Sequence, residues 1–596
     1  MIFDRKFTRV LHIDLTNKRF YKQDRPELFE KYIGGAGVAI QLLKEECPEG
    51  INPFDPQNPI ILATGVLNGL FPLASKTTAM FKSPHTGNLG ESHAGGRSSI
   101  AIKMAGYGAI VIKGKSERPC YIAIHQGKIF FRDATTLWGN KSSISAGHFI
   151  RENEPSSGFR TIIRIGHAGE RLIPFSCVTT ETYRHFGRLG LGAVFGSKNL
   201  KAVVVSGKRS LPVADRLQYN KLYDEIFKSA TESSLMKKYH EIGTPINVAY
   251  LNLSKGLPTR NLKQSHFEEA DKISGEAIAN GYLGKRLACA HCPVACIHIS
   301  AIREPYIDEP YFYKTTMVGY DYELIYALGS MLGGSDVQGM MLLIDKIEHA
   351  GLDCMTTGVV LSWMTEAFEK GLISEKDTQN VFPKWGDYNA YQEALKLMLE
   401  QANDFYVALS KGVSHVSSIY GGKDFALSFG GNEMPGYHTG PAAHLGYLLG
   451  ARHSHLDNAG YSIDLKNMPT MTLSPSEIAH KIITEEKWRQ ILSSLVICFF
   501  AREIYKPDIV IKALETAGLK LTLDELTSIG TEILKDKYAF KIREGFTFEK
   551  LEVPERIFQT PSSVGTINKE FFMESLNSAK EIIKNELLKE SVINDE

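Results

Sequence analysis

Residues 82–115 read KSPHTGNLGESHAGGRSSIAIKMAGYGAIVIKGK and indicate a glycine-rich, β-rich first part of the chain. The stretch ends in an apolar run, GAIVIKG at 108–114, which is typical of a buried β-strand. Its dense glycines favour tight turns or a close approach of the backbone to a bound group. Five residues separate Gly108 from Gly114 where a phosphate-binding loop needs four, so this run is not predicted to be an ATP site.

Apolar segments on both sides of this stretch predict a β-rich region. Two of them read as hairpins, one over residues 8–23 and one over 121–133 with its turn at Gln126-Gly127. GLGAVFG at 190–196 spaces its glycines wrongly for a dinucleotide-binding turn and is expected to lead into a strand, not a helix. No internal repeat is apparent. The remaining strand candidates are NPIILATG (58–65), RTIIRIG (160–166) and KAVVVSG (201–207).

The pattern becomes helical after Arg209. Residues 335–353 carry apolar side chains at helical spacing, and this predicted helix stops at Gly351. A second predicted helix follows over 356–371. We therefore expect an α+β fold, with a β-rich N-terminal domain followed by two mainly helical domains. The expected domains are residues 1–208, 209–423 and 424–596.

A helix start is predicted near residue 474. Pro475 stands at the first helical position, and Glu477 stands where a capping box places its carboxylate. The helical region is expected to run on through EKWRQILSSLVICFFARE at 486–503 and to carry Cys498.

Length and charge exclude several classes of protein. A chain of 596 residues is too long for one hydrophobic core. Lys plus Arg number 68 against 67 Asp plus Glu, so a nucleic-acid or anionic-membrane partner is not predicted. The apolar stretch Ile491–Ala501 falls short of the roughly 20 residues that span a bilayer. The first ten residues have no apolar signal segment, so we expect a cytoplasmic protein.

The segment CAHCPVAC places three thiols at Cys289, Cys292 and Cys296. Iron–sulfur clusters need soft thiolates that converge from a loop, and C-x2-C-x3-C supplies three of them. The fourth ligand has to come from elsewhere, and Cys498 is the best candidate. A structural zinc is the alternative, with His291 or His298 as its fourth ligand.

Two segments carry candidates for acid–base chemistry. ARHSHLDN at 451–458 concentrates arginine, histidine and aspartate, and GYDYE at 319–323 contains Asp321 and Glu323. Chemistry on a carbonyl uses such a pair, because a carboxylate can handle a water proton while an imidazole polarises the oxygen. Each segment taken alone fits a solvated loop or an ion-paired histidine better.

Several co-linear blocks resemble the tungsten-containing aldehyde ferredoxin oxidoreductases over nearly the full length of the chain. The resemblance is densest in residues 82–115, in IGHAGERL at 165–172 and in FGRLGLGAVFGSKNLKAVVVSG at 186–207. CAHCPVAC and DYELIYALG at 321–329 add to it.

The resemblance implies a tungsten ion, or a molybdenum ion, held by two pyranopterins between the β-rich domain and the helical domains. It also implies one [4Fe-4S] cluster on Cys289, Cys292, Cys296 and Cys498, and a magnesium ion that joins the pterin phosphates through the carbonyls of His93 and His185. The residues that would line the pterins are Lys76, His93, Gly95, Gly96, Arg97, Arg184, His185, Gly187, Arg188, Glu348, Leu352, Asp353, Ala451, Arg452, Asp457, Ser493, Ile497 and Phe499.

The same resemblance implies a reaction: a small aldehyde plus water gives a carboxylic acid, two protons and two electrons. Tungsten would act as Lewis acid and two-electron acceptor. Glu323 would take a proton from water, and His455 would hydrogen-bond the carbonyl oxygen, with His453 as the alternative. The cluster would pass electrons singly to ferredoxin or to a ferredoxin-like subunit.

The chain departs from the family at three places. Lys76 stands where arginine is usual, which keeps the charge but loses the guanidinium fork. Of the two pterin-binding D-x-x-G-L-(D/C) motifs, the first reads EHAGLD at 348–353 and the second reads SSLVIC at 493–498. Leu342 and Asp345 replace the Glu-x-x-His pair that binds an iron between subunits in some relatives, so that dimer is not expected.

Other functions remain open from sequence. Related catalytic subunits of benzoyl-CoA-type ring reductases share the architecture and the metal. A zinc-stabilised binding protein belongs to a different class, and a relative that has lost the metal is a third alternative. The sequence identifies neither the aldehyde nor the choice between tungsten and molybdenum.

Overall fold

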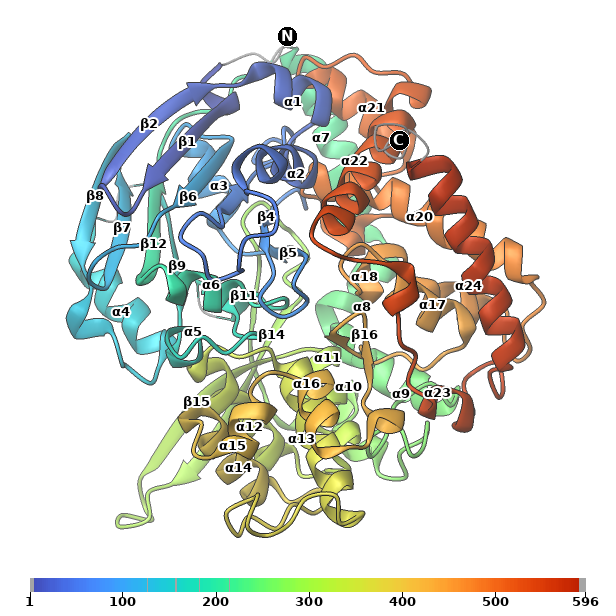
Figure 1. Cartoon of the computed structure of the whole chain (residues 1–596). Helices are drawn as coiled ribbons and strands as arrows, with labels where there is room; N and C mark the ends of the chain where they lie inside the picture. The colour runs from blue at the N-terminus through green and yellow to red at the C-terminus, as the bar shows by residue number, and fades with distance from the viewer. Residues whose placement is uncertain (1–4, 126, 156–157, 182, 214, 589–596) are drawn as a thin grey trace.

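The computed structural model describes residues 5–125, 127–155, 158–181, 183–213 and 215–588 (Figure 1). The β-rich part comes first and the helices follow, so the predicted α+β fold class is confirmed. The helices of the N-terminal part are α1 (Pro26–Tyr32), α2 (Gly35–Glu46), α3 (Ser98–Met104), α4 (Ser143–Asn153), α5 (His167–Glu170) and α6 (Leu191–Ser197).

Two six-stranded sheets make up the N-terminal part. The first has the order β2-β1-β6-β3-β4-β5 and the second β11-β10-β9-β12-β7-β8. The strands of the first sheet are β1 (Arg9–Asp14), β2 (Arg19–Asp24), β3 (Ile60–Ala63), β4 (Thr77–Lys82), β5 (Leu89–Ala94) and β6 (Ala109–Lys113). Those of the second are β7 (Cys120–His125), β8 (Lys128–Asp133), β9 (Phe159–Ile165), β10 (Val178–Thr180), β11 (Arg184–Phe186) and β12 (Leu200–Gly207).

The two sheets repeat one topology. When the six strands of each sheet are numbered in chain order, both sheets have the order 2-1-6-3-4-5. Strands 1 and 6 pair in parallel, and all other neighbours pair antiparallel. This repeat of topology is not visible as an internal repeat in the sequence. The repeat lies in backbone pairing, which many side chains satisfy, so it leaves no matching residues.

The core of this part lies between the two sheets. Leu11 and Ile110 of the first sheet belong to one buried cluster with Ile122 and Val203 of the second. Alternate residues of the first sheet, such as Val111, instead pack into the large cluster that includes α2 and the helical regions. The period of two along each strand thus places the first sheet between the second sheet and the helices.

Two details of the β-rich part differ from the sequence-based expectation or fall outside the described residues. GLGAVFG was expected to lead into a strand, but its residues 191–196 form most of α6, and only then does β12 begin. The hairpin β1–β2 is confirmed, as is the pairing of β7 with β8. The predicted turn residue Gln126 lies outside the described residues.

The helical regions begin after β12. Their helices up to residue 423 are α7 (Arg216–Glu232), α8 (Ser234–Glu241), α9 (Asn247–Leu253), α10 (Gly275–Gly281), α11 (Tyr322–Leu328), α12 (Val337–Ala350), α13 (Cys354–Glu369), α14 (Tyr388–Glu400), α15 (Asp404–Leu409) and α16 (Val413–Tyr420). After a short hairpin of β16 (Ser428–Phe429) and β17 (Asn432–Glu433) come α17 (Pro441–Leu449), α18 (His455–Asn458), α19 (Gly460–Lys466), α20 (Pro475–Ser494), α21 (Pro507–Thr516), α22 (Leu523–Arg543), α23 (Arg556–Gln559) and α24 (Lys569–Ile583).

A third sheet interrupts this helical region, where the sequence analysis expected helices. Its strands β13 (Leu283–Leu287), β14 (Ile297–Pro305) and β15 (Tyr313–Tyr320) are antiparallel. Figure 1 shows β14 and β15 as a hairpin that projects from the body. Period-two burial along Ser300–Arg303 is the strand signal in this segment.

Helix α20 has the predicted capping box between Ser474 and Glu477. It ends at Ser494, however, and does not run on to carry Cys498 as expected. Val496 takes a left-handed conformation with φ 54°, which ends the helix and turns the chain. Within the described ranges no helix is both long and apolar enough to cross a membrane.

Candidate functional site

Three thiols lie on the loop between β13 and β14. A turn closes between the Cys292 amide and the Cys289 carbonyl at 3.2 Å, and positive φ angles at His291 and Ala295 curl the chain between the thiols. Burial raises the pKa of Cys296 to about 12, and the thiols of Cys498 and Cys289 add to the rise. The loop therefore brings these sulfur atoms toward one centre.

Cys498 joins this loop from the chain that follows α20. The Cys498 amide donates to the Leu73 carbonyl at 2.9 Å, while the Leu73 amide donates to the His291 carbonyl at 3.0 Å. Leu73, between β3 and β4, thus ties the two cysteine segments together. The Cys498 segment therefore lies beside the loop that carries Cys289, Cys292 and Cys296, at the boundary between the first sheet and the helical regions.

Of the two histidines of the zinc alternative, His291 lies on the thiol loop itself and His298 lies in β14. The ring of His298 is buried, and its Nε2 lies 3.0 Å from the His240 carbonyl, so backbone engages it. Among the described residues no three metal-ligating side chains come close enough to hold a single ion. A [4Fe-4S] cluster binds each thiolate to a different iron and accepts wider spacing than one zinc ion does.

The glycines after β5 lie against the thiol loop. A methyl group on Gly95 would lie 2.7 Å from Cys289 Sγ, 3.5 Å from Arg184 Cδ and 3.9 Å from Lys76 Nζ. The Gly96 carbonyl accepts a hydrogen bond from the Ala290 amide at 2.9 Å. Two cations, Lys76 just before β4 and Arg184 of β11, therefore lie beside Cys289, around a backbone that needs glycine. Arg97 follows as the N-cap residue of α3.

The motifs EHAGLD at 348–353 and SSLVIC at 493–498 each form a backbone bridge with the β-rich part. Leu352 forms a bridge with Ser176 just before β10, and Ile497 forms one with Ala74 just before β4. Each motif thus contacts the same position of one of the two repeated sheets. Ser493, the last residue but one of α20, and Phe499, the residue after Cys498, flank this contact.

One ion pair, between Arg188 and Asp353, holds the second sheet's side of the site. Arg188 Nε donates to Asp353 Oδ2 at 3.1 Å, and Nη2 donates to the Glu433 carbonyl at 2.8 Å. Arg188 Nη1 is buried and has no hydrogen-bond partner among the described residues. It follows Gly187, which has open space where a side chain would be, and the β11 residue His185.

A second set of buried charges lies on the first sheet's side. Glu91 of β5 accepts from His93 Nε2 at 2.7 Å and pairs with Lys537 of α22 at 2.5 Å. Arg452 is held by Asp457, whose Oδ1 accepts from Nε at 2.6 Å. The Ala451 amide donates to Glu486 of α20 at 2.8 Å. These contacts fix β5 against α22 and the loop before α18 against α20.

Glu323 and His455 form a buried pair. Glu323 is in the first turn of α11, which Asp321 caps, and His455 begins α18. His455 Nε2 lies 3.3 Å from Glu323 Oε1, and the Gly436 amide donates to Glu323 Oε2 at 3.2 Å. His455 Nδ1 and Glu323 Oε1 are buried without a hydrogen-bond partner among the described residues. Two orphaned polar atoms at one place indicate a site for a polar ligand.

His453 lies in a different environment. Its Nδ1 is 3.1 Å from the Tyr447 carbonyl, and its Nε2 is 3.1 Å from Lys541 Nζ. Both ring nitrogens are thus engaged inside the helical region. The structure therefore places His455, and not the alternative His453, beside Glu323.

Burial shifts the protonation of the pair. It raises the pKa of Glu323 to about 8, and the neighbouring Asp321 adds to the rise. Burial also lowers the pKa of His455 well below its usual range, and Arg188 adds to the fall. A neutral imidazole beside a carboxyl that titrates near neutral pH is an arrangement suited to proton transfer.

Tyr437 is a site residue that the sequence analysis missed. Its hydroxyl lowers the pKa of Glu323, and its ring lies 5.2 Å from that of His455 and 4.3 Å from that of Tyr461. No local motif surrounds it, so only the folded chain brings it to the pair. Glu91 was missed too, although it stands two residues before His93 on the same strand face.

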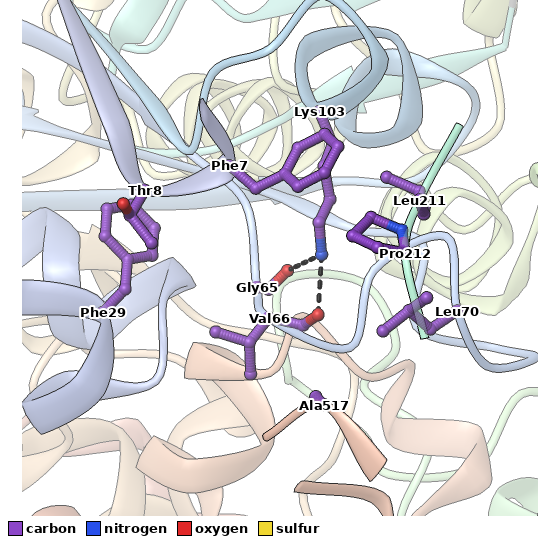
Figure 2. A pocket seen from close by; sticks show the side chains of 10 residues that line it. All are labelled: Phe7, Thr8, Phe29, Gly65, Val66, Leu70, Lys103, Leu211, Pro212 and Ala517. Carbon is purple, nitrogen blue, oxygen red and sulfur yellow. Dashed lines mark hydrogen bonds between the residues drawn. The ribbon is translucent and has the colours of Figure 1, made fainter. Parts of the chain in front are cut away.

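A small cavity near α3 is separate from this chemistry. Figure 2 shows Lys103 reaching toward the carbonyls of Gly65 and Val66, to which Nζ donates at 3.0 and 2.6 Å. Burial lowers the pKa of Lys103 to about 7. The cavity measures about 30 Å³, room for no more than a water molecule. Lys103 thus supports the Gly65 backbone, which in turn packs on Leu495 after α20.

Two family models match this chain. A family model described as aldehyde ferredoxin oxidoreductase, N-terminal domain, matches residues 10–207. A second, described as aldehyde ferredoxin oxidoreductase, domains 2 and 3, matches residues 221–584. The chain is 30% identical over 557 residues to the tungsten-containing aldehyde ferredoxin oxidoreductase of Thermococcus kodakarensis, covering 90% of this chain and 89% of that protein.

Two further similarities widen the range of chemistry. The WOR-like subunit of an aliphatic sulfonate oxidoreductase of Pyrococcus furiosus is 30% identical over 414 residues, 66% of this chain and 64% of that subunit. The solved BamBC active-site complex of benzoyl coenzyme A reductase, with 1,5-dienoyl-CoA, contains a chain that matches with a TM-score of 0.79 at 20% identity. That match covers 98% of this chain and 99% of the other, and it shows a shared fold.

Proposed function

Because the chain belongs to the aldehyde ferredoxin oxidoreductase family, we propose that it oxidises an aldehyde to a carboxylic acid and passes the electrons to a ferredoxin-type carrier. The observation that carries this proposal is the buried Glu323–His455 pair, in which His455 Nδ1 has no hydrogen-bond partner among the described residues. A carboxyl and a neutral imidazole side by side are what hydration and oxidation of a carbonyl require of a protein.

The residues around the pair fit a large anionic cofactor. Lys76, Arg184 and Arg188 bring three cations to the space between the two sheets and the helical regions, and Arg188 Nη1 has no partner among the described residues. Gly95, Gly96 and Gly187 leave backbone open to close approach. We propose that these residues hold a tungsten bis-pyranopterin, with the remaining motif residues around it, and that the carbonyls of His93 and His185 hold the magnesium ion. Tungsten bound there would accept two electrons from the substrate and polarise it.

Glu323 and His455 handle the protons. A proton on Glu323 Oε1 can move to His455 Nε2, 3.3 Å away, as the ring proton at Nδ1 passes to the aldehyde oxygen, which leaves Glu323 ionised. Once ionised, Glu323 Oε1 takes a proton from the water that supplies the second oxygen of the acid. Tyr437 positions the carboxyl through its hydroxyl. The balance is aldehyde plus water to acid, two protons and two electrons.

The four thiols supply the outlet for those electrons. We propose that Cys289, Cys292, Cys296 and Cys498 bind a [4Fe-4S] cluster, which carries one electron at a time. Gly95 lies between Cys289 Sγ and the cations Lys76 and Arg184, so the proposed cluster and cofactor approach each other across one glycine backbone.

Glu323→Gln tests the proposal. We expect turnover of free aldehydes with a viologen dye to fall by about 10²-fold or more, the contribution of a positioned acid–base group. Tungsten and iron contents, measured by mass spectrometry on the same preparation, should stay at the wild-type level. Unchanged turnover would remove Glu323 from the reaction. A wild-type preparation without tungsten or pterin, from a host that makes the cofactor, would overturn the proposal itself.

Ring reduction is the second candidate, because the matched benzoyl coenzyme A reductase chain shares the fold over nearly the whole length. An aliphatic sulfonate is a third substrate class, from the matched Pyrococcus furiosus subunit. Assays of one wild-type preparation with free aldehydes, aryl-CoA thioesters and alkyl sulfonates separate them. We expect activity with aldehydes, and activity confined to either of the other substrates would replace this proposal.

A further inference from the structure

The loop that carries the thiols reaches the protein surface. His291 and Ala288 are exposed, and Cys289, Cys292 and Cys296 are each half-buried. A group held here is therefore close to solvent on one side and to Gly95 on the other. This is the face through which an electron can leave the protein.

Helix α8 packs directly on this loop. His240 Nδ1 lies 2.8 Å from the Val294 carbonyl, and the ring of Tyr239 stacks on that of Phe500 at 4.3 Å, two residues after Cys498. Arg286 of β13 fastens the helix end, because its Nε donates to the His240 carbonyl at 2.8 Å. Helix α8, β13 and the segment after Cys498 thus surround the thiol loop.

These three elements are strongly basic in a chain whose total charge is close to zero. Residues 234–241, 283–287 and 499–503 carry five cationic side chains that are exposed or half-buried, against the carboxylates Glu241 of α8 and Glu503, which lies 3.9 Å from Arg502. The whole chain has 68 basic and 67 acidic residues, so this local excess is not a general property of its surface. The five cations are Lys237, Lys238, Lys285, Arg286 and Arg502.

We propose that this basic ring around the thiol loop is the docking surface for an acidic one-electron carrier protein. The inference rests on the proposed function, because only an electron outlet gives this face a redox partner. Its charge is complementary to an acidic carrier. Such encounters are small and brief, and opposite charges speed them by steering the approach. The half-buried aromatic pair Tyr239–Phe500 offers the short-range contact at the centre of the ring.

The double substitution Lys237→Glu with Lys285→Glu tests the surface. We expect kcat/KM for an acidic ferredoxin to fall by about tenfold or more at low salt, within the range that electrostatic steering supplies. Turnover with methyl viologen, a small cation that needs no docking surface, should stay at the wild-type level. The wild-type rate with ferredoxin should fall with rising ionic strength, and the double variant should show a weaker dependence.

A charge-matched control is available in Lys376→Glu with Lys384→Glu, two exposed lysines of the loop between α13 and α14. An equal loss in this control would show an effect of net charge and overturn the proposal, as would an unchanged ferredoxin rate in the test variant. A titration of the holoenzyme with oxidised ferredoxin measures binding to this surface without catalysis. If binding weakens only in the test variant while dye turnover is absent even in the wild type, the docking surface stands and the proposed reaction fails.

Discussion

The loop that follows α12 and the loop that follows α20 take the same path with different residues. Leu352 donates to the Ile347 carbonyl at 3.1 Å and Ile497 to the Leu492 carbonyl at 2.9 Å, each reaching back five residues. The residue before each is left-handed, Gly351 at φ 78° and Val496 at φ 54°. Both helices therefore end in the same Schellman-type turn, although only one of them has the glycine.

The last side chains of the two loops differ in chemistry. Asp353 caps α13 and binds Arg188, so the first loop ends in an ion pair. Cys498 ends the second loop and faces the thiol segment. The shared part is the backbone that docks on each of the two repeated sheets. The part that differs is the last residue. Asp353 forms an ion pair with Arg188, and Cys498 is the proposed cluster ligand.

The largest difference between the loops should appear on removing their last residues. Cys498→Ala should lose most of the cluster iron and the brown absorbance, because a [4Fe-4S] cluster needs its fourth thiolate. Asp353→Ala should keep the iron, since its carboxylate contacts Arg188 and the start of α13. Iron analysis of the two purified variants checks this. Full iron in Cys498→Ala would assign the fourth ligand to another residue.

The acidic start of the first loop should give a pH effect that the second loop lacks. Burial raises the pKa of Glu348 to about 8, and Asp345 adds to the rise while Arg184 opposes it. Between pH 4.5 and about 8 the native protein keeps a proton that the unfolded chain has released. Stability therefore falls as pH rises, by at most about 1.4 kcal/mol per pH unit.

Glu348→Gln removes this titration, because an amide resembles the protonated carboxyl. Relative to wild type, the variant should gain stability as the pH rises from 5 to 8, in thermal unfolding of the cofactor-free protein. Ser493→Ala at the matching position of the second loop should show no such trend. A constant difference between Glu348→Gln and wild type across this range would mean that Glu348 is already ionised at pH 5.

The glycine of the first loop should be the next most sensitive position. A methyl group on Gly351 would lie 2.9 Å from the Gly166 amide nitrogen and 3.1 Å from its Cα, both rigid backbone atoms. Together with the positive φ, we expect Gly351→Ala to cost about 2–3 kcal/mol in the free energy of unfolding. Denaturant unfolding measures this value.

Gly371 provides the matched control. Its φ is 68°, close to that of Gly351, but no atom lies within 4 Å of the methyl group that alanine would add. Gly371→Ala should therefore lower the free energy of unfolding by only about 1 kcal/mol, because only the left-handed backbone conformation disfavours alanine there. Equal costs at the two positions would show that the contact between Gly351 and Gly166 has no energetic weight.

The sequence was enough for features that depend on local spacing. The capping box at Ser474–Glu477, the end of α12 at Gly351 and the three clustered thiols follow from residue types at fixed intervals. The repeated sheet and the early end of α20 did not, because Val496 is a residue that usually avoids a left-handed turn. Tyr437 was also beyond reach, since its contact with Glu323 joins segments more than a hundred residues apart.

Val496→Gly should have the smallest effect. Val496 is fully buried, so losing its side chain costs about 1.5–3 kcal/mol, but glycine relieves a left-handed strain of about 1–2 kcal/mol. The net loss should be about 1 kcal/mol in denaturant unfolding. Val205→Gly, at an equally buried position of β12 with a strand backbone, has no strain to relieve and should cost clearly more. If Val496→Gly and Val205→Gly lower the free energy of unfolding equally, Val496 is not strained in its left-handed turn. Gly351 would then be needed for its contact with Gly166 and not for the turn.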